Sequence, residues 1–409
     1  MDEENWKTIR GTHVLIEGST GEIKYGPERL RTWGKSKSSA KGKTKPHAVV
    51  KPKSYAEAKA RCDEIRKKIA DDNLEFTDEY ALWQAEYSTE VDGLDFYRRK
   101  LKEMESNPDK YGDKYETRME IIKEQLEETG ARVKDLEDKK PKVFKEYDEA
   151  AKELNEATLR EFPTADDCKT SKDVTDYLRA KGYFRKDNES LFDSDNRVDL
   201  ALMGTENAKG IAEALDKLMT DYPKLVGKLG GIDCRDMSRN PEFSNTYAHT
   251  TGNAISFNMT YYGEGKSVAN IYANDVRSGF HPKGTDWKSV VDHEFTHAIE
   301  KLIERKIRKE DKIANIVMQR AMKRVDGKYD RNEENYVRHQ ISRYAAINDG
   351  IRCASVNGQM KEVENEPYGR NTEFLAEAMV EARQSQNPSK YAIATRKEFE
   401  KLMKEADLL

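Results

Sequence analysis

The chain has 409 residues and a net charge of −4, and its charged and hydrophobic residues make up 36% each. Soluble domains are usually about 45–50% apolar and 25% charged, so this composition argues against one uniform core. The length predicts two or three domains. Because the charges nearly cancel, a globally acidic or basic binding surface is not expected. The sequence contains no apolar run of about 18 residues that would span a membrane.

The cysteine pattern and the start of the chain both bear on the cellular compartment in which the protein works. The cysteines are far apart and form no Cys-x-x-Cys pair, which argues against zinc ribbons and disulfide frameworks and predicts reduced structural thiols. They are Cys62, Cys168, Cys234 and Cys353. The acidic, polar start lacks the layout of a secretory signal. We therefore expect no signal peptide and a cytoplasmic protein.

Two features are expected in the first 54 residues. β-prone runs at 8–16 and 22–25 flank a Gly/Ser turn at 18–21, which predicts a hairpin within residues 1–34. Residues 35–54 are rich in lysine, serine, glycine and proline and offer little to bury, which predicts a flexible linker. No aromatic residue lies between the lysines of this tract, so nucleic-acid binding is not expected.

Residues 55–160 read as a charged helical arm. They contain 21 basic and 29 acidic side chains but only three glycines and two prolines. Apolar residues recur at helical spacing, as in Leu94, Leu101, Met104, and later Met119, Ile122, Leu126, Val133 and Leu136. This pattern predicts long amphipathic helices or an antiparallel, coiled-coil-like hairpin. We expect breaks near Asn107-Pro108 and at Pro141.

Residues 161–409 change in character and predict an α+β domain. At 249 residues, this segment is long enough to bury a sizeable core. The expected elements are helices at 171–182 and 207–220, strands at 243–250 and 253–260, and almost only helix beyond residue 284.

The pattern His293-Glu294-x-x-His297 carries the chemistry. Positions i and i+4 share one face of a helix, so both imidazoles can reach one Zn²⁺ ion. Glu294 is rotated off that pair, towards the open position of the metal, where it can hold the zinc-bound water and take its proton. We expect the helix to start at residues 285–286. Its apolar stripe consists of Val291, Phe295, Ala298, Ile299 and Leu302.

A hydrolytic zinc site needs a third protein ligand. The metzincin pattern would require Gly at position 300 and His at position 303, but the chain has Glu300 and Ile303. The other common solution takes a glutamate from a downstream helix. The candidates Glu373, Glu377 and Glu381 are spaced by four and lie near one helix face. Such an acidic stripe repels itself unless a cation faces it.

Several stretches together resemble the zincin-type domain of phage minor head (head morphogenesis) proteins and the related catalytic domain of anthrax lethal factor. They are GFHPKG at 279–284, HEFTH at 293–297, ISRYAAIN at 341–348 and EFLAEA at 373–378. The resemblance is good over residues 240–385. The short segment at 9–16 also resembles a segment common in phage head proteins.

The resemblance implies roles for individual residues. Glu373 would be the third zinc ligand, and Glu377, one turn later, would accept from the other N–H of a ligand histidine. The alternative, in which Glu377 is the direct ligand, stays open. The family also places a tyrosine before this helix to stabilise the oxyanion. Tyr344 fits that pattern and is preferred, while Tyr368 is a second, shorter match that lies closer to Glu373.

The resemblance implies a mainly helical, zincin-like metallopeptidase domain with a small sheet. Its cofactor would be Zn²⁺, its substrates proteins or peptides, and its partners phage capsid or portal proteins. The chain would then be cytoplasmic in the host cell or associated with the virion. Alternatives are a structural virion protein whose zincin domain is inactive, or a toxin-like injected protease. We also expect the run 253–260 to be an edge strand to which an extended peptide can add.

Overall fold

The computed structural model describes ten stretches of the chain: 6–9, 12–15, 53–185, 198–240, 243–307, 309, 311–349, 351–356, 359–364 and 371–409. Two compact units are present, Met1–Ala157 and Thr158–Leu409. Thr158 lies three residues before the expected start of the second domain at residue 161.

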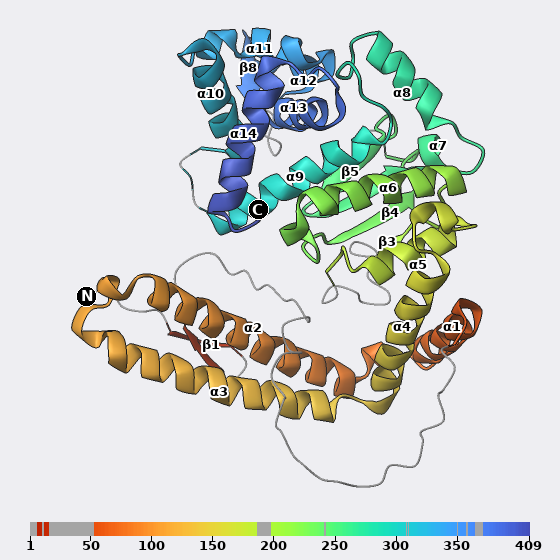
Figure 1. Cartoon of the computed structure of the whole chain (residues 1–409), viewed down its shortest axis with the longest axis vertical. Helices are drawn as coiled ribbons and strands as arrows, with labels where there is room; N and C mark the ends of the chain where they lie inside the picture. Colours follow the sequence, from red (N-terminus) through yellow and green to blue (C-terminus); the bar gives the residue numbers. More distant parts are fainter. Residues whose placement is uncertain are drawn as a thin grey trace. The chain divides into compact units, whose positions relative to one another are not determined.

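The first unit consists mainly of long helices. They are α1 (Tyr55–Asp71), α2 (Asp78–Ser106), α3 (Tyr115–Lys139) and most of α4 (Lys142–Glu161), with 3₁₀ turns η2 (Leu74–Phe76), η3 (Pro108–Lys110) and η4 (Gly112–Lys114) between them. Helices α2 and α3 pack side by side in opposite directions (Figure 1). Trp83 of α2 donates to the carbonyl of Leu136 near the far end of α3. The arm is therefore an antiparallel helical hairpin.

Prolines mark the breaks in this arm, as the sequence predicts. Helix α2 ends at Ser106, and its C-cap Asn107 has φ −139° before Pro108. A proline disfavours helical geometry in the residue before it. Pro141 separates α3 from α4 in the same way. Helix α1 begins with a capping box in which Ser54 and Glu57 satisfy each other's backbone N–H groups.

An N-terminal hairpin is present within residues 1–34, but the chain reverses earlier than predicted. Strands β1 (Trp6–Ile9) and β2 (Thr12–Leu15) pair antiparallel, with Ile9 opposite Thr12. The chain therefore reverses inside the run 8–16, which we had expected to be one strand. Two residues suffice to connect antiparallel strands, so this pairing does not need the turn at 18–21. Residues 16–52, including most of the expected linker, lie outside the described part of the chain.

The second unit is mainly helical. Its helices are α5 (Ser171–Lys181), α6 (Thr205–Asp221), α7 (Met259–Tyr262), α8 (Val268–Arg277), α9 (Ser289–Lys306), α10 (Ile313–Asp326), α11 (Glu334–Ile341), α12 (Arg343–Asn348), α13 (Thr372–Gln384) and α14 (Lys390–Glu405). Three 3₁₀ turns accompany them: η5 (Ala165–Asp167), η6 (Pro223–Leu225) and η7 (Arg331–Glu333). The helices expected at 171–182 and 207–220 correspond to α5 and α6.

One small mixed sheet lies beside these helices. Its strands are β3 (Val198–Asp199), β4 (Gly231–Arg235), β5 (Ala248–Thr251) and β6 (Ala254–Asn258), in the order β3-β4-β6-β5. Strands β3, β4 and β6 are parallel, and β5 is antiparallel to β6. The α+β prediction is confirmed.

The predicted edge strand is wrong. Strand β6 lies inside the sheet, between β4 and β5, and β5 forms the edge. The local pattern of β6 cannot reveal this, because its second neighbour, β4, comes from about twenty residues earlier in the chain. Any strand that adds to the sheet on this side must therefore pair with β5.

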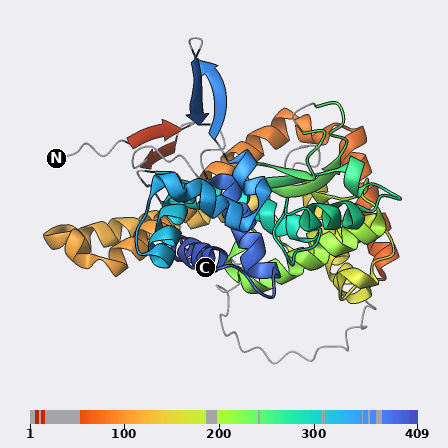
Figure 2. The same ribbon diagram turned by 90° about the horizontal axis from the view of Figure 1, so that it is seen from above.

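The expectation of almost only helix beyond residue 284 is also wrong in one place. Strands β7 (Ile351–Val356) and β8 (Gln359–Glu364) form an antiparallel hairpin, drawn in blue side by side in Figure 2. It lies between α12 and α13 in the chain. Polar and apolar residues alternate only weakly along it, so the period-two signal of a strand is faint.

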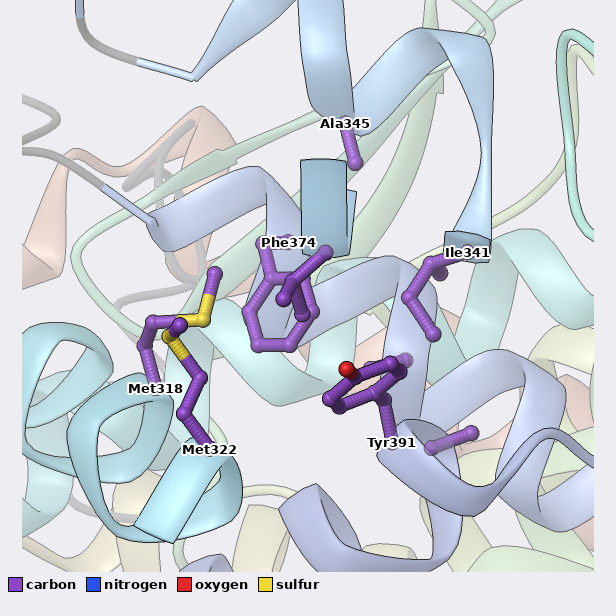
Figure 3. Packing of buried hydrophobic residues seen from close by; sticks show 9 residues of the cluster. Met318, Met322, Ile341, Ala345, Phe374 and Tyr391 are labelled. Atoms are coloured by element: carbon purple, nitrogen blue, oxygen red, sulfur yellow. The ribbon is translucent and has the colours of Figure 1, made fainter. Parts of the chain in front are cut away.

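A buried apolar cluster holds the C-terminal helices together (Figure 3). It joins α10 through α14 by Met318, Met322, Val337, Ile341, Ala345, Phe374, Ala378, Tyr391 and Ala392. The cluster fixes the first turn of α13, because Phe374 is fully buried in it. Three of the four cysteines, Cys62, Cys168 and Cys234, are buried. None of the helices in the described ranges is long and apolar enough to cross a membrane.

Candidate metal centre

Helix α9 carries the histidine motif and starts later than expected. Its first residue is Ser289, and residues 285–286 come before a turn at 287–288. There the Asp286 carboxylate accepts from the backbone N–H of Lys288 at 2.8 Å, and its carbonyl accepts from that of Ser289 at 3.0 Å. Aspartate favours such local backbone bonds over the helix itself, which explains the delay.

The apolar stripe predicted for α9 is buried along its whole length: Val291, Phe295, Ala298, Ile299 and Leu302 are each at most 3% exposed. The helix packs against α13 and against β5 of the sheet (Figure 1). This packing leaves the two histidines on the face of α9 that meets α13.

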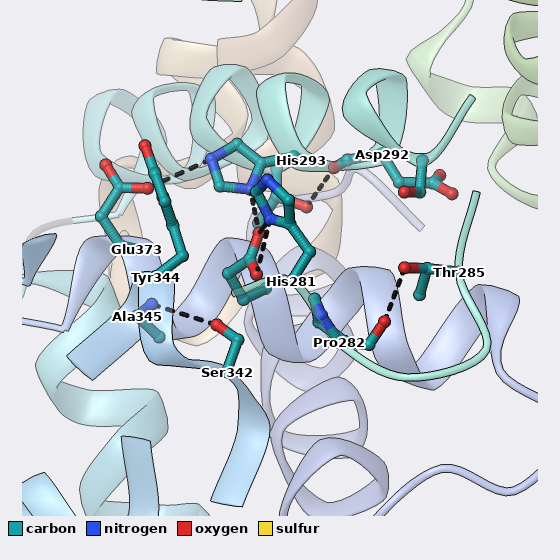
Figure 4. A network of polar contacts seen from close by, with 12 residues as sticks. His281, Pro282, Thr285, Asp292, His293, Ser342, Tyr344, Ala345 and Glu373 are labelled. Carbon is teal, nitrogen blue, oxygen red and sulfur yellow. Dashed lines mark hydrogen bonds and ion pairs between the residues drawn. The ribbon is translucent and has the colours of Figure 1, made fainter. Parts of the chain in front are cut away.

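Three predicted ligands come together there. The Nε2 atoms of His293 and His297 lie 3.1 Å apart. Oε2 of Glu373, on α13, lies 3.1 Å from the first of these nitrogens and 3.6 Å from the second. Among the described residues, these three form the group of donors able to hold one metal ion. Figure 4 shows Glu373 reaching towards His293.

The chemistry and spacing of this group fit zinc. Zinc bonds to nitrogen and oxygen of 2.0–2.1 Å at tetrahedral angles place neighbouring ligand atoms about 3.3 Å apart. The observed separations of 3.1, 3.1 and 3.6 Å lie around that value. Oε2 of Glu373 is buried and has no hydrogen-bond partner within the described ranges. A buried oxygen of this kind needs a partner, and a cation bound by the imidazoles would supply one.

Glu377 lies on the other side of the His293 ring. Its Oε1 accepts from Nδ1 of His293 at 2.9 Å, and the carboxylate is 1% exposed. Burial opposes ionisation, yet His281 and His293 lower the pKa of Glu377 to about 2. The carboxylate therefore stays an acceptor, which fixes the proton on Nδ1 and leaves Nε2 of His293 available to a metal ion. This geometry favours Glu377 as a supporting residue rather than a direct ligand.

A further histidine, His281, shares this carboxylate. Its Nδ1 lies 3.3 Å from both oxygens of Glu377. The His281 ring is 6% exposed and stacks on Tyr272, with ring centroids 4.7 Å apart. The sequence does not predict a role for His281, because this residue lies outside the His-Glu-x-x-His motif and 96 residues from its partner.

The three glutamates of the acidic stripe on α13 lie in two different environments. Although burial disfavours a charged imidazole, the neighbouring carboxylates of Glu373 and Glu377 raise the pKa of His293 well above its ordinary value. The third glutamate, Glu381, instead accepts from the backbone N–H and the hydroxyl of Ser389. Only the first two carboxylates of the stripe therefore contact the candidate ligand His293.

Glu294 lies beside the ligands and contacts the sheet edge. The hydroxyl of Thr250, on β5, donates to Oε2 of Glu294 at 2.5 Å. The same hydroxyl lies 3.1 Å from the carbonyl oxygen of Glu294. The edge strand and the acidic side chain of the motif are thus joined by one residue, and sequence reasoning missed it.

Tyr344 borders the centre, at the start of α12. Its ring lies edge-on to the His293 ring, with centroids 5.7 Å apart. Figure 4 shows it beside the Glu373 carboxylate. The Glu373 charge, together with burial, raises the pKa of Tyr344 well above its ordinary value, so the phenol keeps its proton at neutral pH. The competing candidate, Tyr368, lies outside the described residues.

Buried polar groups set the position of Glu373 on α13. The two oxygens of Asp349 accept from the backbone N–H groups of Glu373 at 2.7 Å and Phe374 at 2.9 Å. Asn371 precedes the helix with φ 68° and accepts from Arg338 through its side chain. Because a helix start leaves N–H groups without partners, Asp349 caps the start of α13 from outside the helix, although it lies 24 residues away from Glu373 in sequence.

At its other end, α13 is joined to α9 by a polar contact. The buried Asp292, next to His293 in sequence, accepts from Arg383 at 2.8 Å and from Gln384 at 2.5 Å. Arg383 is also paired with Asp221, at 3.0 Å. Polar contacts therefore hold helix α13 at both ends, and the second of them ties it to α9 next to His293.

Comparisons with protein-family models, with curated proteins and with solved structures found no match for this chain.

Proposed function

We propose that the chain is a zinc-dependent endopeptidase that hydrolyses peptide bonds. The observation that carries the proposal is the convergence of His293, His297 and Glu373 at the spacing of zinc ligands, with Glu294 beside them. Two imidazoles and one carboxylate are the protein ligands of a common class of catalytic zinc site.

When bound, the zinc ion would polarise the scissile carbonyl and lower the pKa of water towards about 7. Glu294 then acts as the general base and passes the proton to the leaving amine. Its contact with Thr250 holds its carboxylate next to the sheet edge. The neutral phenol of Tyr344 donates a hydrogen bond to the oxyanion that develops on the former carbonyl oxygen.

A peptide substrate suits the edge strand. Strand β5 forms one edge of the sheet and packs against α9. An extended peptide that paired with this edge would lie alongside the residues of the centre, and strand addition is a common mode of peptide recognition. This supports a protein or peptide substrate over a small molecule.

We infer an association with phage head proteins only from the resemblance of four sequence stretches to minor head proteins. The rival is a structural virion protein with an inactive zincin domain. The presence of the base, the tyrosine and all three ligands supports the active enzyme.

Cleavage of a peptide library tests the proposal. The wild type is expected to cleave peptides, and Glu294→Gln is expected to retain zinc but lose activity by about 10²-fold or more. Glu304→Gln, on the same helix but paired with Lys301, is the control and should keep activity. If the wild type binds zinc and cleaves no peptide in the library, the structural virion protein is the better account.

A further inference from the structure

His281 is a buried histidine outside the recognised motif. It lies on the segment between α8 and α9, and its flat stack on Tyr272, at an interplanar angle of 8°, fixes the plane of the ring. Nδ1 points at Glu377, while the buried Nε2 has no hydrogen-bond partner among the residues that the structure describes. Burying a polar imidazole costs free energy unless its polar atoms find partners.

The partner of His281 is the carboxylate of Glu377, which it shares with His293. Glu377 is 1% exposed and has two oxygens to satisfy. His293 donates one N–H to it, at 2.9 Å. His281 donates a second N–H, from an Nδ1 that lies 3.3 Å from either oxygen. Without the second donor, the buried carboxylate would be half satisfied and able to turn away from His293. The ring of a metal ligand keeps its orientation only while its own partner is held.

The segment that carries His281 also holds the tyrosine. The carbonyl of Gly279 accepts from the backbone N–H of Arg343 at 3.0 Å, and that of Phe280 accepts from Tyr344 at 2.9 Å. The rings of His281 and Tyr344 lie 5.3 Å apart. The three consecutive residues 279–281 therefore contact both Glu377, which supports His293, and Tyr344 beside it.

We propose that His281 is a positioning residue of the metal centre. It holds Glu377, which in turn holds the imidazole of His293 with Nε2 towards the zinc ion, and the backbone before it sets the place of Tyr344. The inference rests on the proposed function in so far as the bound ion is Zn²⁺. Figure 4 shows His281, His293 and Tyr344 gathered around this centre.

Zinc affinity, measured by competition with a chelator, tests this role. His281→Phe keeps a flat ring but removes the donor, and it is expected to weaken zinc binding about tenfold. His281→Gln can still donate an amide N–H to Glu377 and should weaken binding less. His339→Phe changes an exposed histidine of the same unit and should leave the affinity unchanged.

A double-mutant cycle shows whether His281 acts through Glu377. In the background of Glu377→Gln, the change His281→Phe is expected to cost no further affinity. Additive losses, or an affinity of His281→Phe equal to that of the wild type, would overturn the inference. If His281→Phe loses its helical circular dichroism, the same cycle run with His281→Gln decides by the same criterion of additivity.

Binding of Co²⁺ separates this inference from the proposed function. The visible absorption of Co²⁺ reports ligand geometry without any catalysis, and we expect the spectrum to change in His281→Phe but not in His339→Phe. A chain that shows these changes and yet cleaves no peptide would refute the peptidase and leave the role of His281 standing. Identical spectra in wild type and His281→Phe would overturn that role.

Discussion

At the scale of single residues, the best-predicted side chains are those whose partners are close in sequence. His293 and His297 share a helix face because they are four residues apart. Glu373 was reached by resemblance, and the structure brings it within 3.1 Å of His293. His281 and Thr250 were missed because their partners lie 96 and 44 residues away, and no local period encodes such pairs.

The hydroxyl of Thr250 orients the proposed general base. Thr250→Val has the same shape but no donor, so the Glu294 carboxylate would lose a hydrogen bond at 2.5 Å. Hydrogen bonds to charged groups contribute about 1.5–3 kcal/mol, so kcat should fall about tenfold or more, with zinc content unchanged. Steady-state peptide cleavage measures this. Thr250→Ser keeps the donor and should stay close to the wild type; equal kcat values for the valine and serine variants would refute the role.

The buried Glu300 is expected to make the free energy of unfolding depend on pH. Burial raises its pKa from 4.5 to about 7. The folded state therefore keeps a proton that the unfolded chain has lost, so this contribution to stability is complete below about pH 4.5 and is lost as the pH rises through about 7. Glu300→Gln keeps an acceptor for the backbone N–H of Ala314, which Glu300 bonds at 3.1 Å.

We expect Glu300→Gln to be near neutral at pH 4.5 and to stabilise the chain by about 1–3 kcal/mol at pH 8. Urea denaturation of the chelator-treated protein at the two pH values measures the difference. A stabilisation that was the same at both pH values would contradict the assignment to this carboxyl group.

At the scale of elements, periodicity predicted most helices and proline predicted their breaks. The apolar stripe of α9 is buried throughout, and Asn107 ends α2 before Pro108. Two features of the sheet structure were not predicted from the sequence. The hairpin β7–β8 carries a weak alternation, and the interior place of β6 depends on pairing with β4. Strand order is a property of long-range pairing, which a local pattern does not contain.

The N-terminal end of α13 depends on a cap from outside the helix. Asp349→Ala removes the acceptor for the N–H groups of Glu373 and Phe374, so it should cost about 1–2 kcal/mol of unfolding free energy. Because Glu373 is one of the freed residues, zinc affinity should fall as well. Urea denaturation and chelator competition measure the two effects.

Thr77→Ala is the matched control for this prediction. Thr77 caps α2 of the first unit by accepting from Tyr80, so its loss should destabilise that helix and leave zinc affinity unchanged. If Asp349→Ala lowered stability but bound zinc like the wild type, the cap would be structural only and would not position the ligand.

At the scale of the whole molecule, the division into two units accounts for the high charged fraction of 36%. The first unit is a helical arm with a dense charged surface, and the second unit, Thr158–Leu409, contains the sheet, the larger core and every described residue of the metal centre. A fragment spanning 158–409 is therefore expected to fold and to bind zinc with the affinity of the full chain. Circular dichroism and chelator competition test this; a fragment that folds but binds zinc far more weakly would show that the arm contributes to the centre.

The central claim is that His293, His297 and Glu373 hold a zinc ion, and zinc stoichiometry tests it most directly. Elemental analysis of the wild type, after dialysis against buffer with trace zinc, should find a single bound ion per chain. A variant with both His293→Ala and His297→Ala should retain none, while Glu294→Gln should retain it, because that carboxylate is not a ligand. A wild type without stoichiometric zinc, or a double variant that keeps it, would contradict the account.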